Sequence, residues 1–218
     1  EMRTPIDRDG LKGVTSNPSI IAKAIGENAE YADALKAFQA EADPGVSAIY
    51  EHLAIADIRA AADVLRPVYE VTRGRDGYIS LECSPYLAND TECTIAEALR
   101  LWAAVERPNL MVKVPATPAG IPAIRRRTAR GLNINVTLLF GVSAYEQVVE
   151  AYLSGLEDLK QAGGDLSQVG SVASFFVSRI DSAIDKRLDK LADKATADLL
   201  RGTVAIASAK IAYGRYQA

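Results

Sequence analysis

The most informative stretch of this sequence is residues 110–117, LMVKVPAT, a short apolar run that contains one lysine and ends near a proline. A strand that is buried on both faces of a parallel sheet has a continuous apolar run of this kind, so we predict a strand over 110–114. Burial favours the neutral amine of Lys113 over its ammonium, and a neutral amine can attack a carbonyl to form a Schiff base. The alternative is a lysine that protects a sheet edge from aggregation. This stretch alone leaves both interpretations open.

The composition and net charge indicate which kinds of partner this protein is expected to lack. The chain has 218 residues, of which 49% are hydrophobic, and its net charge is −3. An acidic balance argues against nucleic-acid or membrane-surface partners, which require a basic patch. No apolar run approaches the ~20 residues of a membrane helix, and we find no signal peptide. We therefore expect a cytoplasmic protein with a sizeable core.

Cysteine and histidine are too sparse for several common kinds of site. Cys83 and Cys93 form no CxxC motif, and His52 is the single histidine. These residues cannot make a conventional zinc site, and His52 falls within a predicted helix, a poor place for the histidine of a Ser-His-Asp or Cys-His mechanism. The sequence therefore predicts a reduced protein without a conventional zinc site.

Apolar runs alternate along the chain with segments of helical periodicity. Residues 94–97, TIAE, fit a capping box at the start of one helix. We predict strands over 10–15, 78–82, 110–114, 134–139 and within 168–176, and helices over 20–25, 29–42, 46–72, 91–106, 119–130, 143–162, 178–192 and 198–216.

This alternation indicates βαβ units and a parallel sheet, hence an α/β fold. We find no linker or repeat, so residues 1–218 are predicted to form a single domain. A (β/α)8 barrel of the TIM type needs eight strands and typically ~250 residues, so about five strands would make an incomplete one. An open Rossmann sheet is the alternative, although no GxGxxG motif follows any strand.

Each predicted strand ends in polar or ionisable residues. In a barrel the active site lies at the carboxyl ends of the strands, so together these residues suggest one site. They are Thr15, Asn17, Glu82, Lys113, Asn135, Thr137 and Ser174, with Arg179 at the start of the following helix.

Several of these residues also have a structural explanation. Asn17 precedes a proline, which favours a turn or a helix cap. Glu82 is either a solvated strand end or an acid/base beside the lysine. Asn135 and Thr137 share one face of their strand, as a polar pocket or as a hydrogen-bonded core pair.

Arg179 is the second most informative residue. It falls in the first turn of a helix for which we predict Ser178 as the N-cap. A cation at this position opposes the helix dipole, which makes sense if an anion such as phosphate binds there. The arginines within 125–130 are predicted instead to form a solvated helix face.

Five stretches of the sequence have a familiar pattern, namely VTSNPS at 14–19, SLE at 80–82, VKVPAT at 112–117, NINVTLLF at 133–140 and SFFVSRI at 174–180. Together they closely resemble the transaldolase family, and the likeness covers almost the whole chain, in order. Residues 117–121, TPAGI, and the helix over 207–216 are most similar to the bacterial branch that includes transaldolase–phosphoglucose isomerase fusions.

The resemblance implies a (β/α)8 barrel and a Schiff-base mechanism without a cofactor. Such enzymes transfer a dihydroxyacetone unit from a ketose phosphate, sedoheptulose 7-phosphate or fructose 6-phosphate, to an aldose phosphate in the non-oxidative pentose phosphate pathway. The implied partners are sugar phosphates, with a homo-oligomer or a fused glucose-6-phosphate isomerase domain possible. By residue match, the resemblance implies that Lys113 is the nucleophile and Glu82 the acid/base, which acts through a water that Thr137 helps to hold. It implies that Arg179 binds the phosphate. The other residues implied to bind substrate are Thr15, Asn17, Asn135 and Ser174.

The sequence departs from the family at both ends. The family's first barrel strand carries an aspartate that acts as base, and here that strand would precede residue 1, while Asp7 and Asp9 lie in the following helix. The strands after Tyr216 are missing too, and residue 1 is Glu rather than Met. We therefore expect a piece of a longer chain with weak or no activity by itself.

Two other functions stay open. One is a Schiff-base aldolase like fructose-6-phosphate aldolase, which releases the three-carbon unit instead of transferring it. The other is an inactive barrel fragment whose open edges pair in an oligomer.

Overall fold

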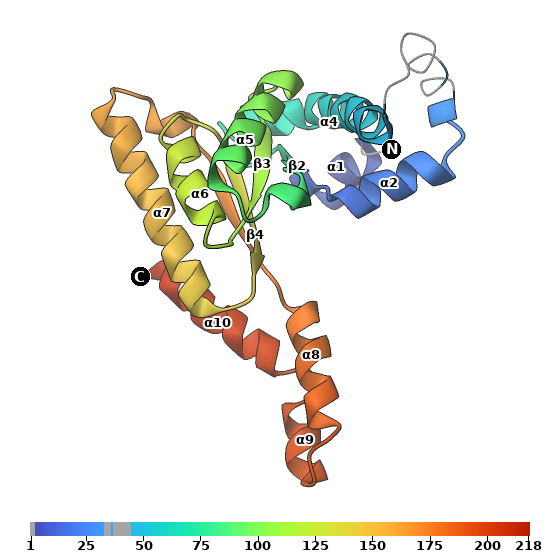
Figure 1. Ribbon diagram of the computed structural model, residues 1–218, viewed down its shortest axis with the longest axis vertical. Helices are drawn as coiled ribbons and strands as arrows, with labels where there is room; N and C mark the ends of the chain where they lie inside the picture. Colours follow the sequence, from blue (N-terminus) through green and yellow to red (C-terminus); the bar gives the residue numbers. More distant parts are fainter. Residues whose placement is uncertain (1–2, 33–35, 37–44) are drawn as a thin grey trace.

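The described residues form one parallel sheet. The structure is a computed structural model that describes residues 3–32, 36 and 45–218. Its five described strands are β1 (Gly13–Thr15), β2 (Tyr78–Glu82), β3 (Leu110–Pro115), β4 (Ile134–Leu139) and β5 (Ser171–Phe175). They stand in the order β1-β2-β3-β4-β5, so each strand pairs with the next along the chain (Figure 1).

This strand order distinguishes the two predicted folds. A doubly wound sheet reverses its direction of growth at a switch point, whereas this sheet grows in one direction throughout, as the wall of a barrel does. The prediction of an incomplete (β/α)8 barrel with five parallel strands is confirmed, and the Rossmann alternative is wrong.

Helices connect the successive strands. The first described helix, α1 (Arg3–Asp9), precedes β1. The crossovers contain α2 (Pro18–Glu27) and α4 (Val46–Val71), then α5 (Thr91–Val105), α6 (Gly120–Thr128) and α7 (Val142–Gln161). Short 3-10 helices lie at Pro85–Leu87 (η1) and Leu166–Gln168 (η2).

Alternate residues of the strands face two different environments. Residues such as Leu81, Val112 and Val136 are buried in the core that the strands share with α4, α5, α6 and α7. The intervening residues carry polar groups on the opposite, inner face, as strand alternation requires. Four polar residues of this face are buried, namely Ser80, Lys113, Asn135 and Thr137.

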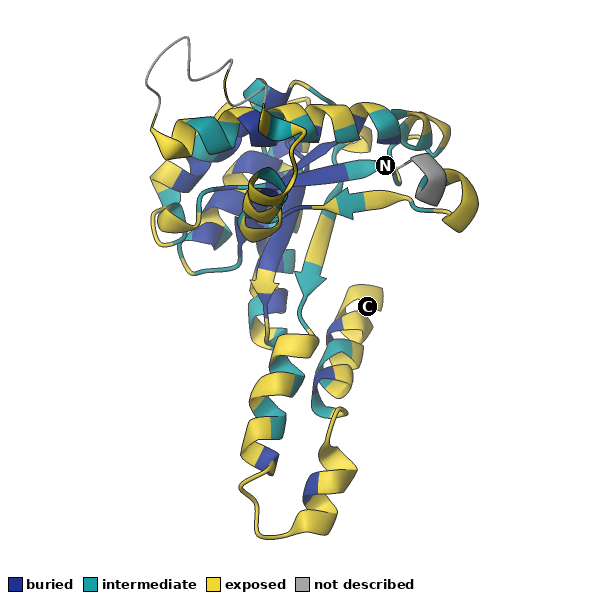
Figure 2. Ribbon diagram, turned by 90° about the vertical axis from the view of Figure 1, so that its right-hand side faces the viewer, coloured by how far each residue is buried: buried dark blue, intermediate teal, exposed yellow. Residues whose placement is uncertain are grey.

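The C-terminal helices extend away from the sheet. Figures 1 and 2 show α8 (Ser178–Leu188) and α9 (Lys194–Leu200) projecting from the body, while α10 (Val204–Gln217) returns alongside α8 to contact α7. Most of their surface is exposed (Figure 2). No helix among the described residues is long and apolar enough to cross a membrane.

Two predictions of local structure need correction, and a third falls mostly outside the described residues. The predicted helix over 198–216 is two helices, because the chain turns at Gly202, whose φ of +68° is left-handed. The predicted capping box is wrong: Asp90 caps α5 by accepting from the Cys93 amide, and Thr94 lies inside the helix, where its hydroxyl donates to Leu87 O. Most of the predicted helix over 29–42 lies outside the described residues.

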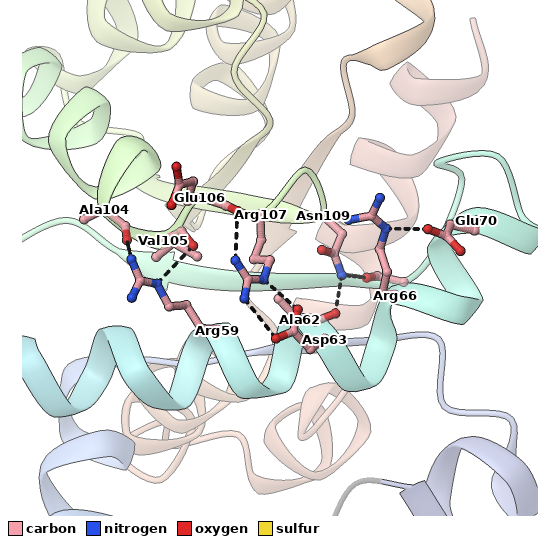
Figure 3. A network of polar contacts seen from close by, with 11 residues as sticks. Arg59, Ala62, Asp63, Arg66, Glu70, Ala104, Val105, Glu106, Arg107 and Asn109 are labelled. Atoms are coloured by element: carbon pink, nitrogen blue, oxygen red, sulfur yellow. Dashed lines mark hydrogen bonds and ion pairs between the residues drawn. The ribbon is translucent and has the colours of Figure 1, made fainter. Parts of the chain in front are cut away.

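A polar network fixes the position at which β3 begins. Figure 3 shows Arg107, in the loop before β3, donating to both carboxylate oxygens of Asp63 on α4 at 2.6 and 3.0 Å. The buried amide of Asn109 donates to the carbonyls of Ala62 and Gly77, both at 2.8 Å. Because Asn109 directly precedes Leu110, these bonds hold the lysine strand against α4 and β2.

The close approach of α6 to the end of β3 gives a testable prediction. A Cβ on Gly120 would stand 1.9 Å from the carbonyl oxygen of Pro115, which is backbone and cannot move aside. Gly120→Ala should therefore lower the free energy of unfolding by roughly 1–3 kcal/mol, measured by urea denaturation.

The matched control is Gly214→Ala in α10, where a Cβ would meet no atom within 4 Å. This change should raise the free energy of unfolding by roughly 0.5–1 kcal/mol, the gain of alanine over glycine inside a helix. Equal effects of the two substitutions would contradict the packing at Gly120.

Candidate active site

The candidate site centres on an ion pair between adjacent strands. Lys113 Nζ on β3 lies 3.2 Å from Glu82 Oε2 on β2. The lysine is 7% exposed, and its amine also donates to the carbonyl oxygen of Ser16 at 3.0 Å. A buried ammonium without such partners would be costly, so the carboxylate and the carbonyl are what make this position possible.

The register of the sheet brings these groups together. Glu82 pairs directly with Lys113, and Lys113 pairs with Asn135 on β4. Directly paired residues of parallel strands face the same side, so all three side chains lie on the inner face at the carboxyl ends of their strands. This is where a barrel carries its catalytic residues.

Asn135 links three strands through its side chain. Its amide nitrogen donates to the hydroxyl of Ser80 on β2 at 2.9 Å, and its carbonyl oxygen accepts from the hydroxyl of Ser174 on β5 at 2.8 Å. The Ser16 hydroxyl donates to the Ser80 carbonyl at 2.7 Å. The hydrogen bonds around Asn135 therefore extend to Ser16, whose own carbonyl accepts from Lys113. Asn135 is therefore a hydrogen-bonded inner-face residue beside the lysine.

Thr137 is also buried and lies two residues beyond Asn135 on the same strand. The pairing of β4 with β5 shifts between Val136 and Leu139, which marks a bulge. Leu138, within the bulge, has a left-handed φ of +60°. The inserted residue lets Thr137 face inward while Leu139 points into the core.

The residues at the end of β1 have two different environments. Thr15 pairs with Ser80 and is exposed on the inner face. Asn17 is half-buried, and its Oδ1 accepts from the Ile20 amide at 2.9 Å as the N-cap of α2. The capping interpretation of Asn17 is thus confirmed for its oxygen.

Arg179 lies in the first turn of α8, as predicted, but Ser178 is not the N-cap. Val177 occupies that position, without a side-chain capping bond. The guanidinium carbon of Arg179 lies 4.9 Å from the centre of the Phe176 ring. No carboxylate of the described residues pairs with Arg179, and no described contact links it directly to Lys113 or Glu82.

The arginines of α6 only partly form the predicted solvated face. Arg125 and Arg126 are exposed and pair with Asp158 and Glu92. Arg127 is buried instead, and its Nε has no hydrogen-bond partner among the described residues. The prediction of a wholly solvated run is therefore wrong at Arg127, because the packing of α6 buries this position.

Burial shapes the electrostatics around the ion pair. Desolvation raises the pKa of the Cys83 thiol, next to Glu82 in the chain, to about 12. Burial first and the charge of Glu82 second raise the pKa of Tyr50 on α4. Both groups therefore stay neutral near pH 7, so neither adds charge beside the ion pair.

A cavity lies against the inner face of the sheet, beside the candidate site. Its volume is about 360 Å³, and it is lined by Thr15, Ser80, Met111 and Asn135 among others, but not by Lys113 or Glu82. Within the described ranges, no group of three His, Cys, Asp or Glu residues is placed to hold a metal ion.

Comparison with known proteins identifies the family. The family model described as transaldolase/fructose-6-phosphate aldolase matches residues 1–218. The chain belongs to this family. Among curated relatives, the transaldolase of Trichodesmium erythraeum is 48% identical over 100% of the chain and 59% of the relative. That of Thermobifida fusca is 52% identical over 97% and 57%, and that of Mycobacterium tuberculosis is 47% identical over 97% and 56%.

The chain thus spans little more than half the length of these transaldolases. The family membership predicted from the sequence is confirmed. The detail of a branch with fused isomerases stays a prediction, as do the oligomeric state and the cytoplasmic location.

Sequence reasoning missed Ser16 and Ser80 as members of the site. Ser80 lies two residues before Glu82, so strand alternation alone places both on one face. The carbonyl of Ser16 gave no such signal, because backbone contacts depend on how β1 ends.

The hydrogen bond between Asn135 and Ser80 can be tested by stability. Ser80→Ala leaves the buried amide of Asn135 without its acceptor, which should cost about 1–3 kcal/mol of unfolding free energy, measured by urea denaturation. The control, Ser19→Ala at an exposed position of α2, should change it by less than about 0.5 kcal/mol. Equal stability of the two variants would contradict this contact.

The two cysteines should differ in reactivity. The thiolate is the reactive form, and Cys83 is buried with a pKa of about 12, whereas Cys93 is exposed and its pKa is raised by the neighbouring Asp90. At pH 8 iodoacetamide should modify Cys93, faster as the pH rises, and should modify Cys83 only after denaturation. Peptide mass mapping reads the outcome, and rapid native labelling of Cys83 would contradict its burial.

Proposed function

We propose that this chain carries the Schiff-base site of a transaldolase, which transfers a dihydroxyacetone unit between sugar phosphates. The observation that carries the proposal is the 3.2 Å pair of Lys113 Nζ and Glu82 Oε2 on the inner face of the sheet. Family membership supports it. Asn135 and Ser174, linked beside the pair, are polar groups suited to substrate hydroxyls.

The ion pair suits the first chemical step. Attack on a ketone requires the neutral amine, and the lysine proton has an acceptor in Glu82. The protonated carboxyl can then return this proton, through a water beside Thr137, to the hydroxyl that leaves the carbinolamine as water. An iminium forms, and it accepts the electron pair of the adjacent carbon–carbon bond as that bond breaks. The hydroxyl on the departing carbon gives its proton to a base and becomes the aldehyde that departs; the family resemblance assigns this base to an aspartate of the first barrel strand.

The product of cleavage remains bound as an enamine on Lys113. Attack of this enamine on the aldehyde of an aldose phosphate forms the new carbon–carbon bond, and hydrolysis of the iminium releases the new ketose. Arg179, a cation without a carboxylate partner among the described residues, is the group we assign to the substrate phosphate. Thr15 and the amide nitrogen of Asn17 lie at the neighbouring end of β1 and are assigned to substrate hydroxyls.

Borohydride trapping tests this proposal. Fructose 6-phosphate followed by borohydride should attach a reduced adduct to Lys113, identified by peptide mass spectrometry. Lys113→Met should abolish the adduct, and Lys160→Met, at an exposed lysine of α7, should leave it unchanged. Glu82→Gln should slow adduct formation by roughly 10²-fold or more, the usual contribution of a general acid/base.

The products distinguish transfer from simple cleavage. A transaldolase should form a new ketose phosphate, sedoheptulose 7-phosphate, from fructose 6-phosphate only when erythrose 4-phosphate is supplied. Free dihydroxyacetone in the absence of an acceptor would favour the aldolase of the same family instead. A folded chain that forms no adduct, and elutes as an oligomer in size-exclusion chromatography, would support the inactive fragment.

A further inference from the structure

Three side chains form a stacked row at the carboxyl ends of β4 and β5. The rings of Phe140 and Phe176 are stacked, with centres 5.0 Å apart and planes inclined by 26°. The guanidinium carbon of Arg179 lies 4.9 Å from the centre of the Phe176 ring. Phe176 therefore contacts both the ring of Phe140 and the arginine of α8.

The row depends on the bulge in β4. Paired residues of β4 and β5 differ in number by 37 at Ile134 and Ser171, but by 36 at Leu139 and Phe175. The Phe176 amide donates to the Leu139 carbonyl at 2.8 Å, which extends the shifted register. Phe140 consequently stands opposite Phe176, whereas an unshifted register would have placed it opposite Val177.

The ring stack is not explained by core packing. Phe140 is 41% exposed, although a phenyl ring of the core would be buried, and Phe176 is only half-buried. The neighbouring Phe175 points the other way, toward the ring of Tyr145. Two partly exposed rings at the ligand-binding end of the sheet, beside an arginine without a carboxylate partner, indicate a role at the surface of the site.

We propose that Phe140 is a positioning residue for the phosphate-binding arginine. It acts through Phe176, whose ring provides a flat surface on which the planar guanidinium of Arg179 stacks. Stacking holds the arginine while leaving the N–H groups at the edge of its plane available for a phosphate. This inference rests on the proposed function, because it takes Arg179 as the group that binds the substrate phosphate.

Adduct formation measures the effect on the phosphate. In Phe140→Leu, the fructose 6-phosphate concentration that gives half-maximal borohydride adduct on Lys113 should rise roughly two- to fivefold, because the Phe176 ring loses its support and the exposed cation–π contact of Arg179 with that ring is weakened or lost. The corresponding concentration of dihydroxyacetone, which has the ketone but no phosphate, should not change. Phe140→Tyr keeps the ring and should behave as the unsubstituted chain.

A matched control separates this role from general stability. Phe175→Leu makes the same chemical change one residue before Phe176, but on the side of the sheet that faces α7. It should leave both half-maximal concentrations unchanged, with folding verified by circular dichroism for every variant. An equal rise for both ketones in Phe140→Leu, or the same rise in Phe175→Leu, would overturn the inference.

A second measurement does not depend on catalysis. The Phe176 ring should shift the Arg179 side-chain NMR signals upfield through its ring current, and Phe140→Leu should reduce this shift, whereas Phe140→Tyr should not. Unchanged Arg179 signals in Phe140→Leu would overturn the inference even if Lys113 forms its adduct. Absence of any adduct in the unsubstituted chain would instead overturn the proposed function, and the phosphate role of Phe140 with it.

Discussion

The structure depends on one ion pair held between two neighbouring strands. An ammonium and a carboxylate taken out of water each cost several kcal/mol, and only good geometry recovers this cost. Here the direct pairing of Glu82 with Lys113 supplies the geometry, and the Ser16 carbonyl accepts a hydrogen bond from the lysine nitrogen. The end of β1, the register of β2 and β3, and the buried Lys113 therefore all meet at this ion pair.

The same strands serve two purposes because their side chains alternate. One face is apolar and packs on the helices, so it supplies the stability of the domain. The other face carries a chain of hydroxyl and amide groups from Ser174 through Asn135 to Ser80, each member of which has a partner. A polar network of this kind specifies one arrangement, since every unmatched register would leave a buried polar group without a partner.

The sequence was most informative where a periodic pattern repeats over several residues. Strand β2 was predicted with its observed bounds, and the inner face followed from alternation once Lys113 was recognised. Prediction was wrong where one local contact decides. Asp90 rather than Thr94 caps α5, and the chain turns at Gly202 between α9 and α10. Arg127 is buried because of how α6 packs, which no pattern within its own helix reveals.

The bulge at Leu138 illustrates a feature that sequence patterns do not predict and that packing explains. A left-handed φ costs a residue with a side chain roughly 1–2 kcal/mol, so the conformation persists only if its surroundings impose it. Leu139 is fully buried on one side of the sheet, and Thr137 is buried on the other. Thr137 and Leu139 are two positions apart, so in a regular strand they would face the same side of the sheet. Leu138 is the extra residue of the bulge, and it allows the two side chains to face opposite sides. The same register shift places Phe140 opposite Phe176, whose ring contacts Arg179. The strained backbone at Leu138 therefore sets both the packing of Leu139 in the core and the contact between the two phenylalanine rings.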